Sequence, residues 1–475
     1  MITLRLAVHT LGCKLNQLET ESVLAAFREA SWEIVPWGER ADLYIINTCT
    51  VTSMAEQKAR RLMRNVLREN SQALVIATGC YAQLDPDAIR DIGLEGYSDR
   101  LVVLSGDAKS SLHRLPAYID GELCSPADLP ALVAAWTRDP QDLERFSFAP
   151  SRFEYHSRGF LKIQDGCDNA CSFCRVRLAR GRSRSLEAPE VLSRLKALED
   201  AGYNEAVLTG INLQSYNDSR APGGLGFRLP DLLPWLLEHS NRIALRISSS
   251  EIDGFDDAYA RAVASPRIRP HFHLSVQSGS DRILRLMRRR YTRKDVLNAV
   301  ELLRSVKDDP FIACDIITGF PGETDEDFEA TRSLCEEVGF AWIHAFPYSS
   351  RPGTEAANMM PHIPERVAAE RVHVLVPLAH EGRRAYARRM SGRTIRAIVE
   401  TSRGGASTGG RLPLVTALGE NYLRCALSIP PAFDLPAPRS AIIARIVSPA
   451  EDHQHEDEFD VHAVMEAFDT GESDR

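Results

Sequence analysis

Short apolar runs alternate with longer amphipathic runs over the first 92 residues. The apolar runs have the length of strands, and the amphipathic runs repeat at helical spacing. In chain order the runs are Leu4–Val8, Glu19–Ala30, Leu43–Ile46, Ala55–Arg68, Leu74–Ala77 and Pro86–Ile92. Strands that alternate with helices in this way predict a parallel sheet flanked by helices. We therefore expect an N-terminal α/β domain over residues 1–124 and, from the prolines and scattered charges that follow, a connector over 125–158.

The alternation resumes after the connector and repeats about six times. Strands are expected at 160–165, 205–210, 243–249, 271–277, 311–318 and 342–347. Helices are expected between them, near 189–201, 229–239, 256–264, 294–306 and 325–338. Six such units fall short of the eight that close a full barrel. The pattern predicts an incomplete α/β barrel within a domain of residues 159–390, which ends in a helix from Pro364 to about Met390.

The last part of the chain changes to short alternating apolar runs separated by Gly- and Pro-rich turns. These runs are Thr394–Glu400, Leu412–Leu418, Tyr422–Leu427 and Ala441–Val447. They predict a small all-β barrel of the oligonucleotide-binding type over residues 391–448. Residues 449–475 are acidic and poor in apolar side chains, so we expect a disordered tail in which Val461–Phe468 could form a short helix.

Composition places the chain among ordinary globular proteins, with 475 residues, 44% of them apolar and 26% charged. No run of about 18 apolar residues is present, and the N-terminus reads as a strand instead of a secretory signal. We therefore expect a cytoplasmic protein with no membrane partner. Ten cysteines in such a setting suit reduced thiols more than a disulfide framework.

The distribution of charge leaves room for a nucleic-acid partner. The formal net charge is −8, but residues 449–475 hold ten Asp and Glu and one Arg, so the other 448 residues sum to about +1. Arginines cluster after residue 174 and near residue 383, and such clusters can contact phosphates or form ion pairs on a helix face. The candidate phosphate contacts are Arg180, Arg182, Arg184, Arg383 and Arg384.

The most specific chemical motif is a C-x3-C-x2-C triplet after the first predicted barrel strand. It consists of Cys167, Cys171 and Cys174. Three close thiolates can hold three irons of a four-iron cluster and leave the fourth iron open to a small molecule. The alternative is structural zinc, which usually takes four protein ligands, and no fourth Cys or His lies nearby in the sequence.

Three further cysteines follow the first three predicted strands of the N-terminal domain. They are Cys13, Cys49 and Cys80. Because the carboxyl ends of parallel strands share one edge of a sheet, these cysteines are expected to converge into a second metal site. Buried, inert cysteine is the alternative for each one alone. Cys124, Cys314, Cys335 and Cys425 occupy no such position and are expected to be ordinary residues.

Several predicted barrel strands end in Gly, Ser, Thr or amide residues, where barrel ligands gather. Glycine there lets the backbone approach a ligand closely, although turn formation alone explains many such glycines. The candidate cofactor-binding residues are Thr209, Gly210, Asn212, Ser249, Gln277, Gly319, Gly322 and Glu323.

These motifs resemble the radical S-adenosylmethionine (SAM) superfamily and, across nearly the whole chain, its methylthiotransferase family. The similarity rests on the cysteine triplet, on the segment from Arg180 to Ser185, and on Leu274–Asp281 and Gly319–Thr324. The segment from Thr10 to Glu21 is most similar to the branch that acts on N6-threonylcarbamoyladenosine in tRNA. One departure is the stretch Arg175-Val176-Arg177-Leu178-Ala179-Arg180, which stands where the family usually has Ile-Val-Pro-Tyr-Thr-Arg. It adds two arginines, Arg175 and Arg177.

The resemblance implies an N-terminal cluster domain, a radical SAM partial (α/β)6 barrel and a C-terminal TRAM barrel. It implies two 4Fe-4S clusters, one on each cysteine trio, and SAM bound at the second one. One SAM would donate a methyl group to a sulfur atom held at the N-terminal cluster. A second would yield the radical that activates C2 of the modified adenine. The partners would be tRNA, a reductant and a sulfur donor whose identities the resemblance does not give.

Two alternatives remain at this point. The same chemistry could act on isopentenyladenosine in tRNA or on a ribosomal-protein aspartate. A chain with the same folds could instead be a non-catalytic zinc- and RNA-binding protein.

Overall fold

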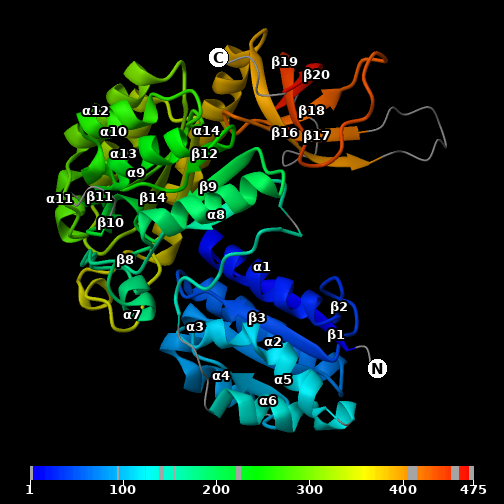
Figure 1. Ribbon diagram of the computed structural model, residues 1–475. Coiled ribbons are helices and arrows are strands. Elements are labelled where there is room, and N and C mark those ends of the chain that lie inside the picture. Colours follow the sequence, from blue (N-terminus) through cyan, green and yellow to red (C-terminus); the bar gives the residue numbers. More distant parts are fainter. Residues whose placement is uncertain are drawn as a thin grey trace.

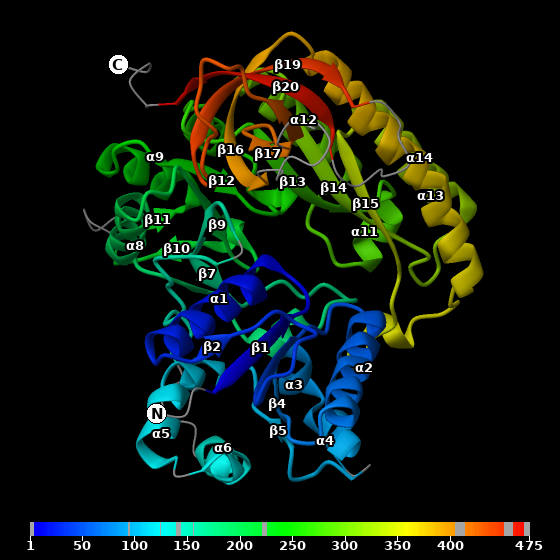
Figure 2. The ribbon, with the colours of Figure 1, turned by 90° about the vertical axis from the view of Figure 1, so that its right-hand side faces the viewer.

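The computed structural model describes residues 4–93, 96–123, 125–138, 144–154, 156–220, 226–403, 414–450 and 459–469. Figures 1 and 2 show a lower N-terminal domain, an α/β barrel above it and a small β-barrel near the top, next to a long helix. Cys124 lies outside the described residues, whereas Cys314, Cys335 and Cys425 are buried. None of the described helices is both long and apolar enough to cross a bilayer.

The N-terminal domain is built on a parallel five-stranded sheet, as the alternation predicts. Its order is β2-β1-β3-β4-β5. Every residue of β3 and β4 is buried, because helices cover both faces of a parallel sheet. The strands are β1 (Arg5–Thr10), β2 (Glu33–Ile34), β3 (Leu43–Thr48), β4 (Leu74–Gly79) and β5 (Leu101–Val103).

In the described part of this domain, six helices and two short 3-10 turns surround the sheet. The helices are α1 (Lys14–Glu29), α2 (Ser53–Glu69), α3 (Cys80–Leu84), α4 (Pro86–Gly93), α5 (Leu115–Glu122) and α6 (Leu129–Arg138), and the turns are η1 (Lys109–His113) and η2 (Pro126–Asp128). Helix α6 lies inside the predicted connector. Its Leu129 and Val133 are buried with Leu115 and Ile119 of α5 in one core, so the packing of the first domain extends beyond residue 124.

The middle of the chain forms the predicted incomplete barrel of parallel strands. Two three-stranded sheets, β12-β9-β6 and β13-β14-β15, meet through a bridge between Ser250 and Leu274. The barrel strands are β6 (Gly159–Lys162), β9 (Glu205–Thr209), β12 (Ala244–Ile247), β13 (His271–Gln277), β14 (Phe311–Thr318) and β15 (Trp342–Pro347). All six predicted strands are therefore confirmed: β13, β14 and β15 have the predicted bounds, and the ends of β6, β9 and β12 are shifted by a few residues.

Helices follow the barrel strands at the expected places, and smaller elements lie between them. The longer helices are α8 (Ala188–Asp200), α9 (Leu229–His239), α10 (Asp257–Val263), α12 (Arg293–Val306), α13 (Asp325–Val338) and α14 (Glu365–Met390). Two short helices, α7 (Val176–Arg180) and α11 (Asp281–Leu286), were not predicted. The other small elements are β7 (Gln164–Asp165), β8 (Arg184–Ser185), β10 (Asn217–Asp218), β11 (Phe227–Arg228), η3 (Leu213–Ser215), η4 (Ile252–Gly254) and η5 (Ala356–Asn358).

The C-terminal domain is a closed five-stranded barrel of order β16-β17-β18-β20-β19. Its strands are β16 (Thr394–Arg403), β17 (Leu414–Gly419), β18 (Arg424–Ser428), β19 (Ala441–Pro449) and β20 (Val461–Phe468). Strand β20 corrects the prediction of a disordered tail with a short helix. It pairs with β18 and β19, and Val461, Ala463 and Met465 alternate into the barrel core. The remaining acidic residues, 451–458 and 470–475, lie outside the described residues.

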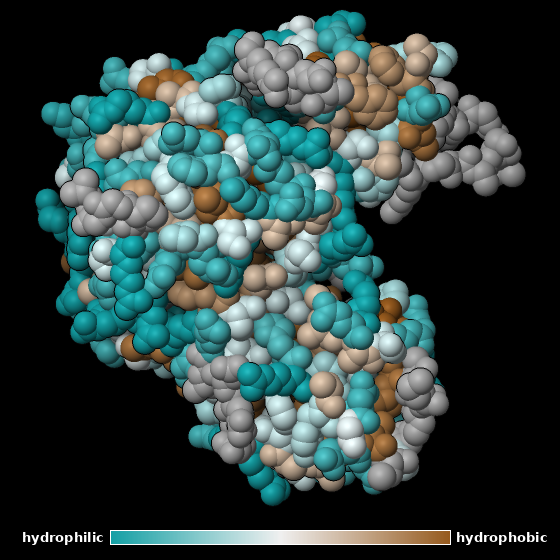
Figure 3. Space-filling view, in the orientation of Figure 1, coloured by the Kyte–Doolittle hydropathy of each residue, from teal (hydrophilic) through white to brown (hydrophobic). Residues whose placement is uncertain are grey.

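The three domains share their packing surfaces. One apolar core runs from Leu18 and Phe27 of α1 to Phe160 and Ile163 of the barrel. A second joins Tyr386 and other residues of α14 to the C-terminal barrel. Helix α1 thus lies between the N-terminal sheet and the barrel (Figures 1 and 2). A broad hollow opens on one side of the molecule, between the C-terminal barrel and the N-terminal domain (Figure 3).

Candidate functional site

The first cysteine trio lies at one edge of the N-terminal sheet. Cys13 precedes α1, Cys49 directly follows β3, and Cys80 begins α3 after β4. Strands β1, β3 and β4 are neighbours and parallel, so their carboxyl ends lie side by side. The three thiols are close enough to interact electrostatically. The sheet therefore brings together cysteines that are 31 to 67 residues apart in the sequence.

Polar side chains tie the three cysteine loops to one another. Asn16 Nδ2 donates to the carbonyls of Leu11 (2.8 Å) and Thr48 (3.1 Å), which belong to the loops of Cys13 and Cys49. Thr48 Oγ1 donates to the carbonyl of Thr78 (2.5 Å) and accepts from the amide of Ala82 (3.2 Å), which flank Cys80. These side chains are buried, so the spacing of the loops is fixed from inside the fold.

Two glycines allow the cysteine loops to approach closely. Gly12 has φ +100°, and a Cβ there would lie 2.7 Å from Cys49 Sγ. Gly79 has φ +99°, and a Cβ there would lie 2.4 Å from the carbonyl oxygen of Thr48. Both positions need the left-handed backbone that glycine adopts without strain. No larger residue fits between the neighbouring loops without moving them.

The second trio lies on the loop that follows β6 and β7. Backbone amides of Asn169 and Val176 donate to the sulfurs of Cys167 and Cys174, each at 3.4 Å. Burial raises the pKa of all three thiols, to about 12 for Cys174. Such thiols stay protonated in the empty protein, and metal binding has to displace their protons.

Most of the predicted strand-end residues of β9 lie beside this loop. Gln164 Oε1 accepts from the amides of Ile211 and Asn212, both at 2.9 Å, and fixes the turn after Thr209 and Gly210. Asn212 also interacts with the thiol of Cys167. Its Oδ1 is buried and has no hydrogen-bond partner among the described residues. An unpaired acceptor at this position suits a ligand that carries an N–H donor.

The ends of β12 and β13 supply further polar groups. Gln277 is buried at φ +65°, an unusual backbone for a residue with a side chain, whereas Ser249 is exposed. Glu251 and Arg289 form an ion pair of 2.5 Å, and both interact with the charges on the cysteine trio. Arg289 also lies over the ring of Phe173, 5.5 Å from its centre.

The end of β14 is held by a buried carboxylate. Glu323 accepts from the amide of Gly319 at 2.6 Å and pairs with Arg371 of α14 at 2.5 Å. A Cβ on Gly319 would lie 2.3 Å from the Cβ of Ala368. Gly322 has φ +79° and no such crowding. Glu323 therefore fixes this loop to α14, and Gly319 allows the helix to approach.

Both trios have a donor set that fits an iron–sulfur cluster. Each offers three thiols, and backbone amides donate to three of the six sulfurs, including Val51 to Cys49 at 3.4 Å, as is common around such clusters. In the ranges that the structure describes, no three His, Cys, Asp or Glu side chains gather tightly enough to hold one metal ion. In a four-iron cluster each cysteine binds a different iron, so the ligands need not converge on one point.

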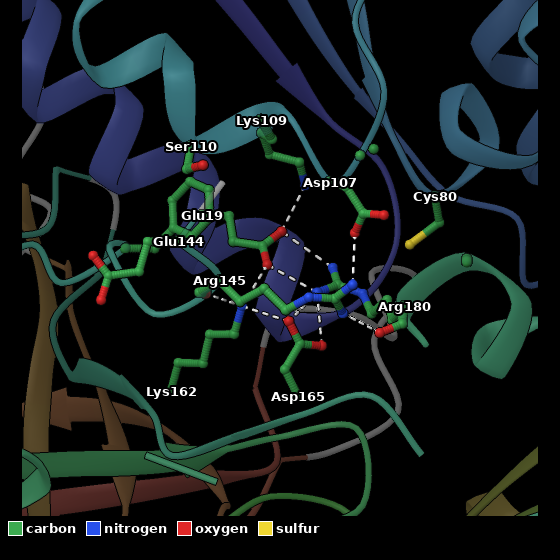
Figure 4. Close-up of a pocket in the computed structure, with 14 residues that line it drawn as sticks. Glu19, Cys80, Asp107, Lys109, Ser110, Glu144, Arg145, Lys162, Asp165 and Arg180 are labelled. Atoms are coloured by element: carbon green, nitrogen blue, oxygen red, sulfur yellow. Dashed lines mark hydrogen bonds and ion pairs between the residues drawn. The ribbon is translucent and has the colours of Figure 1, made fainter. Parts of the chain in front are cut away.

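Arg180 joins the two halves of the site and corrects one sequence-based expectation. It is 7% exposed and donates to Glu19 (2.8 Å), Asp165 (3.2 Å) and Asn16 (2.8 Å). A side chain buried and bonded in this way does not present its charge to RNA phosphates. Figure 4 shows its guanidinium facing Glu19 and Asp165, with Cys80 beside it.

The buried charges around Arg180 line a cavity of about 30 Å³ between the two domains, which has room for water. Lys109 contacts Glu19 at 2.6 Å, and Lys162 contacts Asp165 at 2.7 Å and Glu19 at 3.1 Å. Burial opposes ionisation of Glu19, but Arg180, Lys109 and Lys162 outweigh it and hold its pKa well below the usual range. Asp107, Glu144 and Arg145 complete the lining, so four cations face four carboxylates and the charges balance.

The other candidate phosphate contacts differ in exposure. Arg182 and Arg184 are exposed. Arg384 is exposed and lies 3.5 Å from Glu381. Arg383 pairs with Asp460 at 2.9 Å and lies over the ring of Trp342. The role of these four arginines as phosphate contacts stays a prediction. For Arg383, a phosphate would have to replace the carboxylate of Asp460.

The two unusual arginines near the second trio also differ. Arg175 is buried and forms a bidentate pair with Asp85 at 2.8 and 3.2 Å, whereas Arg177 is exposed. Helix α3, which begins at Cys80, packs against α7, which follows Cys174. The Arg175–Asp85 pair thus fastens the two cysteine-bearing segments to each other.

The sequence interpretation assigned no role to several residues that shape the site. Asn16 and Glu19 lie in the segment from Thr10 to Glu21, where their polarity within an apolar helix is the available signal. Glu251 follows three serines at the end of the third predicted barrel strand, and Arg289 lies in a run of three arginines. Only the packing reveals that Arg289 is paired inside the protein.

Comparisons with known proteins agree with this architecture. Residues 161–335 match the Radical SAM superfamily, whose members use SAM and a 4Fe-4S cluster, and residues 5–96 match the uncharacterized protein family UPF0004. The chain is 41% identical over 469 residues to the threonylcarbamoyladenosine tRNA methylthiotransferase MtaB of Treponema pallidum, covering 88% of this chain and 93% of the relative.

Two further relatives are similar over most of the chain, at lower identity. The MtaB protein of Bacillus subtilis is 36% identical over 396 residues, covering 83% of this chain and 84% of the relative. The tRNA-2-methylthio-N(6)-dimethylallyladenosine synthase of Stutzerimonas stutzeri is 32% identical over 409 residues, covering 84% and 88%.

Proposed function

Since this chain belongs to the radical SAM methylthiotransferase family, we propose that it transfers a methylthio group to C2 of N6-threonylcarbamoyladenosine at position 37 of tRNA. The product would be 2-methylthio-N6-threonylcarbamoyladenosine. The choice of substrate rests on the 41% identity over 469 residues to a relative named for this nucleoside. The 32% identity to a dimethylallyladenosine synthase makes isopentenyladenosine the nearest alternative.

Cys167, Cys171 and Cys174 would hold the cluster that binds SAM, and Cys13, Cys49 and Cys80 would hold a second cluster. When bound, these groups would supply the electron that cleaves SAM and an iron site for the sulfur that is transferred. Asn212 Oδ1 would accept from the amine of SAM, because it is buried without a partner beside Cys167. Glu323 would hold the loop of Gly319 and Gly322 in place for SAM.

The arrangement of the two trios supports one reaction shared by both. Cys80 begins α3, Cys174 precedes α7, and these helices pack against each other. Asn16 and Thr48 keep the first trio together, and Arg175 pairs with Asp85 across the gap. A substrate held between the domains could then reach both sites without leaving the protein.

We propose that tRNA occupies the hollow between the C-terminal barrel and the N-terminal domain (Figure 3). A small closed β-barrel beside a hollow suits RNA that is held by its backbone while one base is turned inward. The exposed Arg182 and Arg184 would contact phosphates near the second cysteine trio. Arg383 and Arg384 would do so near the C-terminal barrel.

Nucleoside analysis of tRNA tests this function. In a strain that lacks the protein, mass spectrometry should find N6-threonylcarbamoyladenosine without its 2-methylthio form, and the wild-type gene should restore the product. Unchanged 2-methylthio-N6-threonylcarbamoyladenosine would refute the proposal. Loss of the 2-methylthio form of isopentenyladenosine instead would identify the alternative substrate.

A second experiment separates the enzyme from a zinc- and RNA-binding protein. Anaerobic reconstitution should give about eight irons per chain, as expected for two four-iron clusters, and release 5′-deoxyadenosine from SAM. One zinc per chain and intact SAM would contradict the enzymatic proposal.

A further inference from the structure

Lys14 is a cation that lies where residues of the three domains come together. It is the first residue of α1, directly after Cys13. It is partly buried, and across the described ranges no hydrogen bond or ion pair is found for its ammonium. A charged group kept from water in this way is normally neutralised by a partner.

The surroundings of Lys14 come from the other two domains. Tyr422 of the C-terminal barrel lies within electrostatic range of its ammonium, as do Arg158, Arg246 and the carboxylate of Glu205 at the α/β barrel. Both arginines lie over the ring of Tyr422: the guanidinium carbons of Arg246 and Arg158 are 5.3 and 5.9 Å from its centre. The imidazole of His271 stacks on the same Tyr422 ring, with the ring centres 4.1 Å apart. The site is therefore assembled from all three domains.

The carboxylates in this cluster do not balance its cations. Glu205 pairs with Arg246 at 2.6 Å and with Arg269 at 2.9 Å, and Arg158 lies 3.8 Å from it. Glu420 lies 3.3 Å from Arg269, and the nearest other carboxylate to Arg158 is Glu400 at 3.9 Å. Four cations thus face three carboxylates. Arg246 and Arg269 form close ion pairs with Glu205, whereas Arg158 lies 3.8 Å or more from both of its carboxylates. Lys14 has no ion pair among the described residues.

Two independent observations mark this cluster as open to an anion. Arg158 Nε is buried and has no partner among the described residues. Burial alone would raise the pKa of Tyr422, yet Lys14, Arg158 and Arg246 together lower it, which indicates a positive potential at the ring. The cluster has unpaired donors and excess positive charge at the same place.

We propose that Lys14, assisted by Arg158, binds the carboxylate of the threonylcarbamoyl group on the substrate adenosine. This inference rests on the proposed function and specifies how the substrate is selected. An amino-acid carboxylate is ionised at neutral pH, and neither adenosine nor isopentenyladenosine carries one on its base. Since Lys14 follows Cys13, a base anchored by this carboxylate would lie next to the first cysteine trio.

Anticodon stem-loops that differ only at position 37 provide the test. Binding to the anaerobically reconstituted protein is measured by fluorescence anisotropy for N6-threonylcarbamoyladenosine and for unmodified adenosine. Lys14→Met should weaken binding of the modified stem-loop about 10- to 100-fold, the range for loss of a hydrogen bond to a charged group, and leave the unmodified one unchanged. Lys14→Arg should keep most of the preference, and the exposed Lys58→Met serves as the charge-matched control. Iron content is measured for each variant.

Each result has a distinct meaning. If Lys14→Met weakens both stem-loops equally, Lys14 contacts an RNA phosphate and the carboxylate proposal is overturned. If it weakens neither, the proposal is also overturned, although the reaction proposed above would stand. If the wild-type protein does not methylthiolate the threonylcarbamoyladenosine stem-loop, the proposed function itself fails.

Discussion

Arg180 Nη2 donates a 2.8 Å hydrogen bond to Asn16 Oδ1, so a side chain of the barrel domain orients the amide that ties the N-terminal cysteine loops together. The amide of Asn16 can then present only its NH2 group to the carbonyls of Leu11 and Thr48. The bond crosses from the segment that follows the second trio to the segment that follows Cys13. Assembly of the first metal site therefore depends on the docking of the two domains.

Replacing Arg180 should disturb the first cluster more than the second. Arg180→Gln removes a positive charge beside the first trio, so that cluster should lose iron and shift to a lower reduction potential. Both are measured by iron analysis and by EPR titration in a Cys171→Ala background, where only the first trio is complete. The matched control is Arg182→Gln, because Arg182 is exposed two residues away. If the two variants had the same iron content and the same reduction potential, the role assigned to Arg180 would be contradicted.

The two cysteine trios should fail in different ways. Cys171→Ala should abolish cleavage of SAM, because the second trio loses a ligand. Cys49→Ala should leave cleavage intact but stop methylthiolation of tRNA, and each variant should retain about four irons per chain. Release of 5′-deoxyadenosine and the modified nucleoside are quantified in the same reaction. Methylthiolation by Cys49→Ala would remove the need for a second cluster.

Crowding at Gly12 predicts a local effect on the first trio. Gly12→Ala adds a Cβ 2.7 Å from Cys49 Sγ as well as the strain of a left-handed backbone. Gly38 has a similar φ of +106° but open space around it, so Gly38→Ala isolates the strain. In the Cys171→Ala background, iron bound per chain should fall by more than half for Gly12→Ala and stay near the parent value for Gly38→Ala. If both variants keep their iron, the close approach of Gly12 to Cys49 does not matter for the metal site.

Glu205 should support stability in a pH-dependent way. Burial opposes its ionisation, but Arg246 and Arg269 outweigh it and lower the pKa of Glu205 from 4.5 to about 2. A carboxyl with a depressed pKa stabilises the fold above its unfolded value, and this contribution disappears as the pH falls from about 4.5 to about 2.

Glu205→Gln should therefore lower the free energy of unfolding at pH 7 by about 3–5 kcal/mol, as for loss of one partner of a buried pair. The difference from the wild type, measured by denaturant unfolding, should shrink as the pH falls. The control is Glu400→Gln, whose partially exposed carboxylate lies 3.9 Å from Arg158 and should matter by at most about 1 kcal/mol. A constant difference at every pH would show that Glu205 is not ionised in the fold.

The alternation of apolar and polar residues was sufficient to predict the two α/β domains. Strands β3 and β4 begin with continuous apolar residues and are buried throughout, because parallel sheets are covered on both faces. Short elements escaped prediction for lack of length: β2 has two residues and β5 three. Strand β20 was misread because its acidic surroundings outweighed the period-two pattern of Val461, Ala463 and Met465.

The positions of the cysteines could be inferred because strand ends of a parallel sheet are adjacent by topology. Whether an arginine is buried in an ion pair or exposed could not be inferred, because this depends on which carboxylates the tertiary packing brings near. Arg180 and Arg182 are two residues apart, yet one is buried against α1 and the other is exposed. A charge cluster in a sequence does not distinguish these outcomes.

The buried charges between the first two domains have an evolutionary consequence. Glu19 and Lys109 belong to one domain, and Lys162 and Arg180 to the other. A chimaera that combined this N-terminal domain with an unrelated barrel would bury unpaired charges at the interface between the two domains. Selection must therefore act on the two modules as a unit, and a change on one side should be tolerated only when a complementary change occurs on the other.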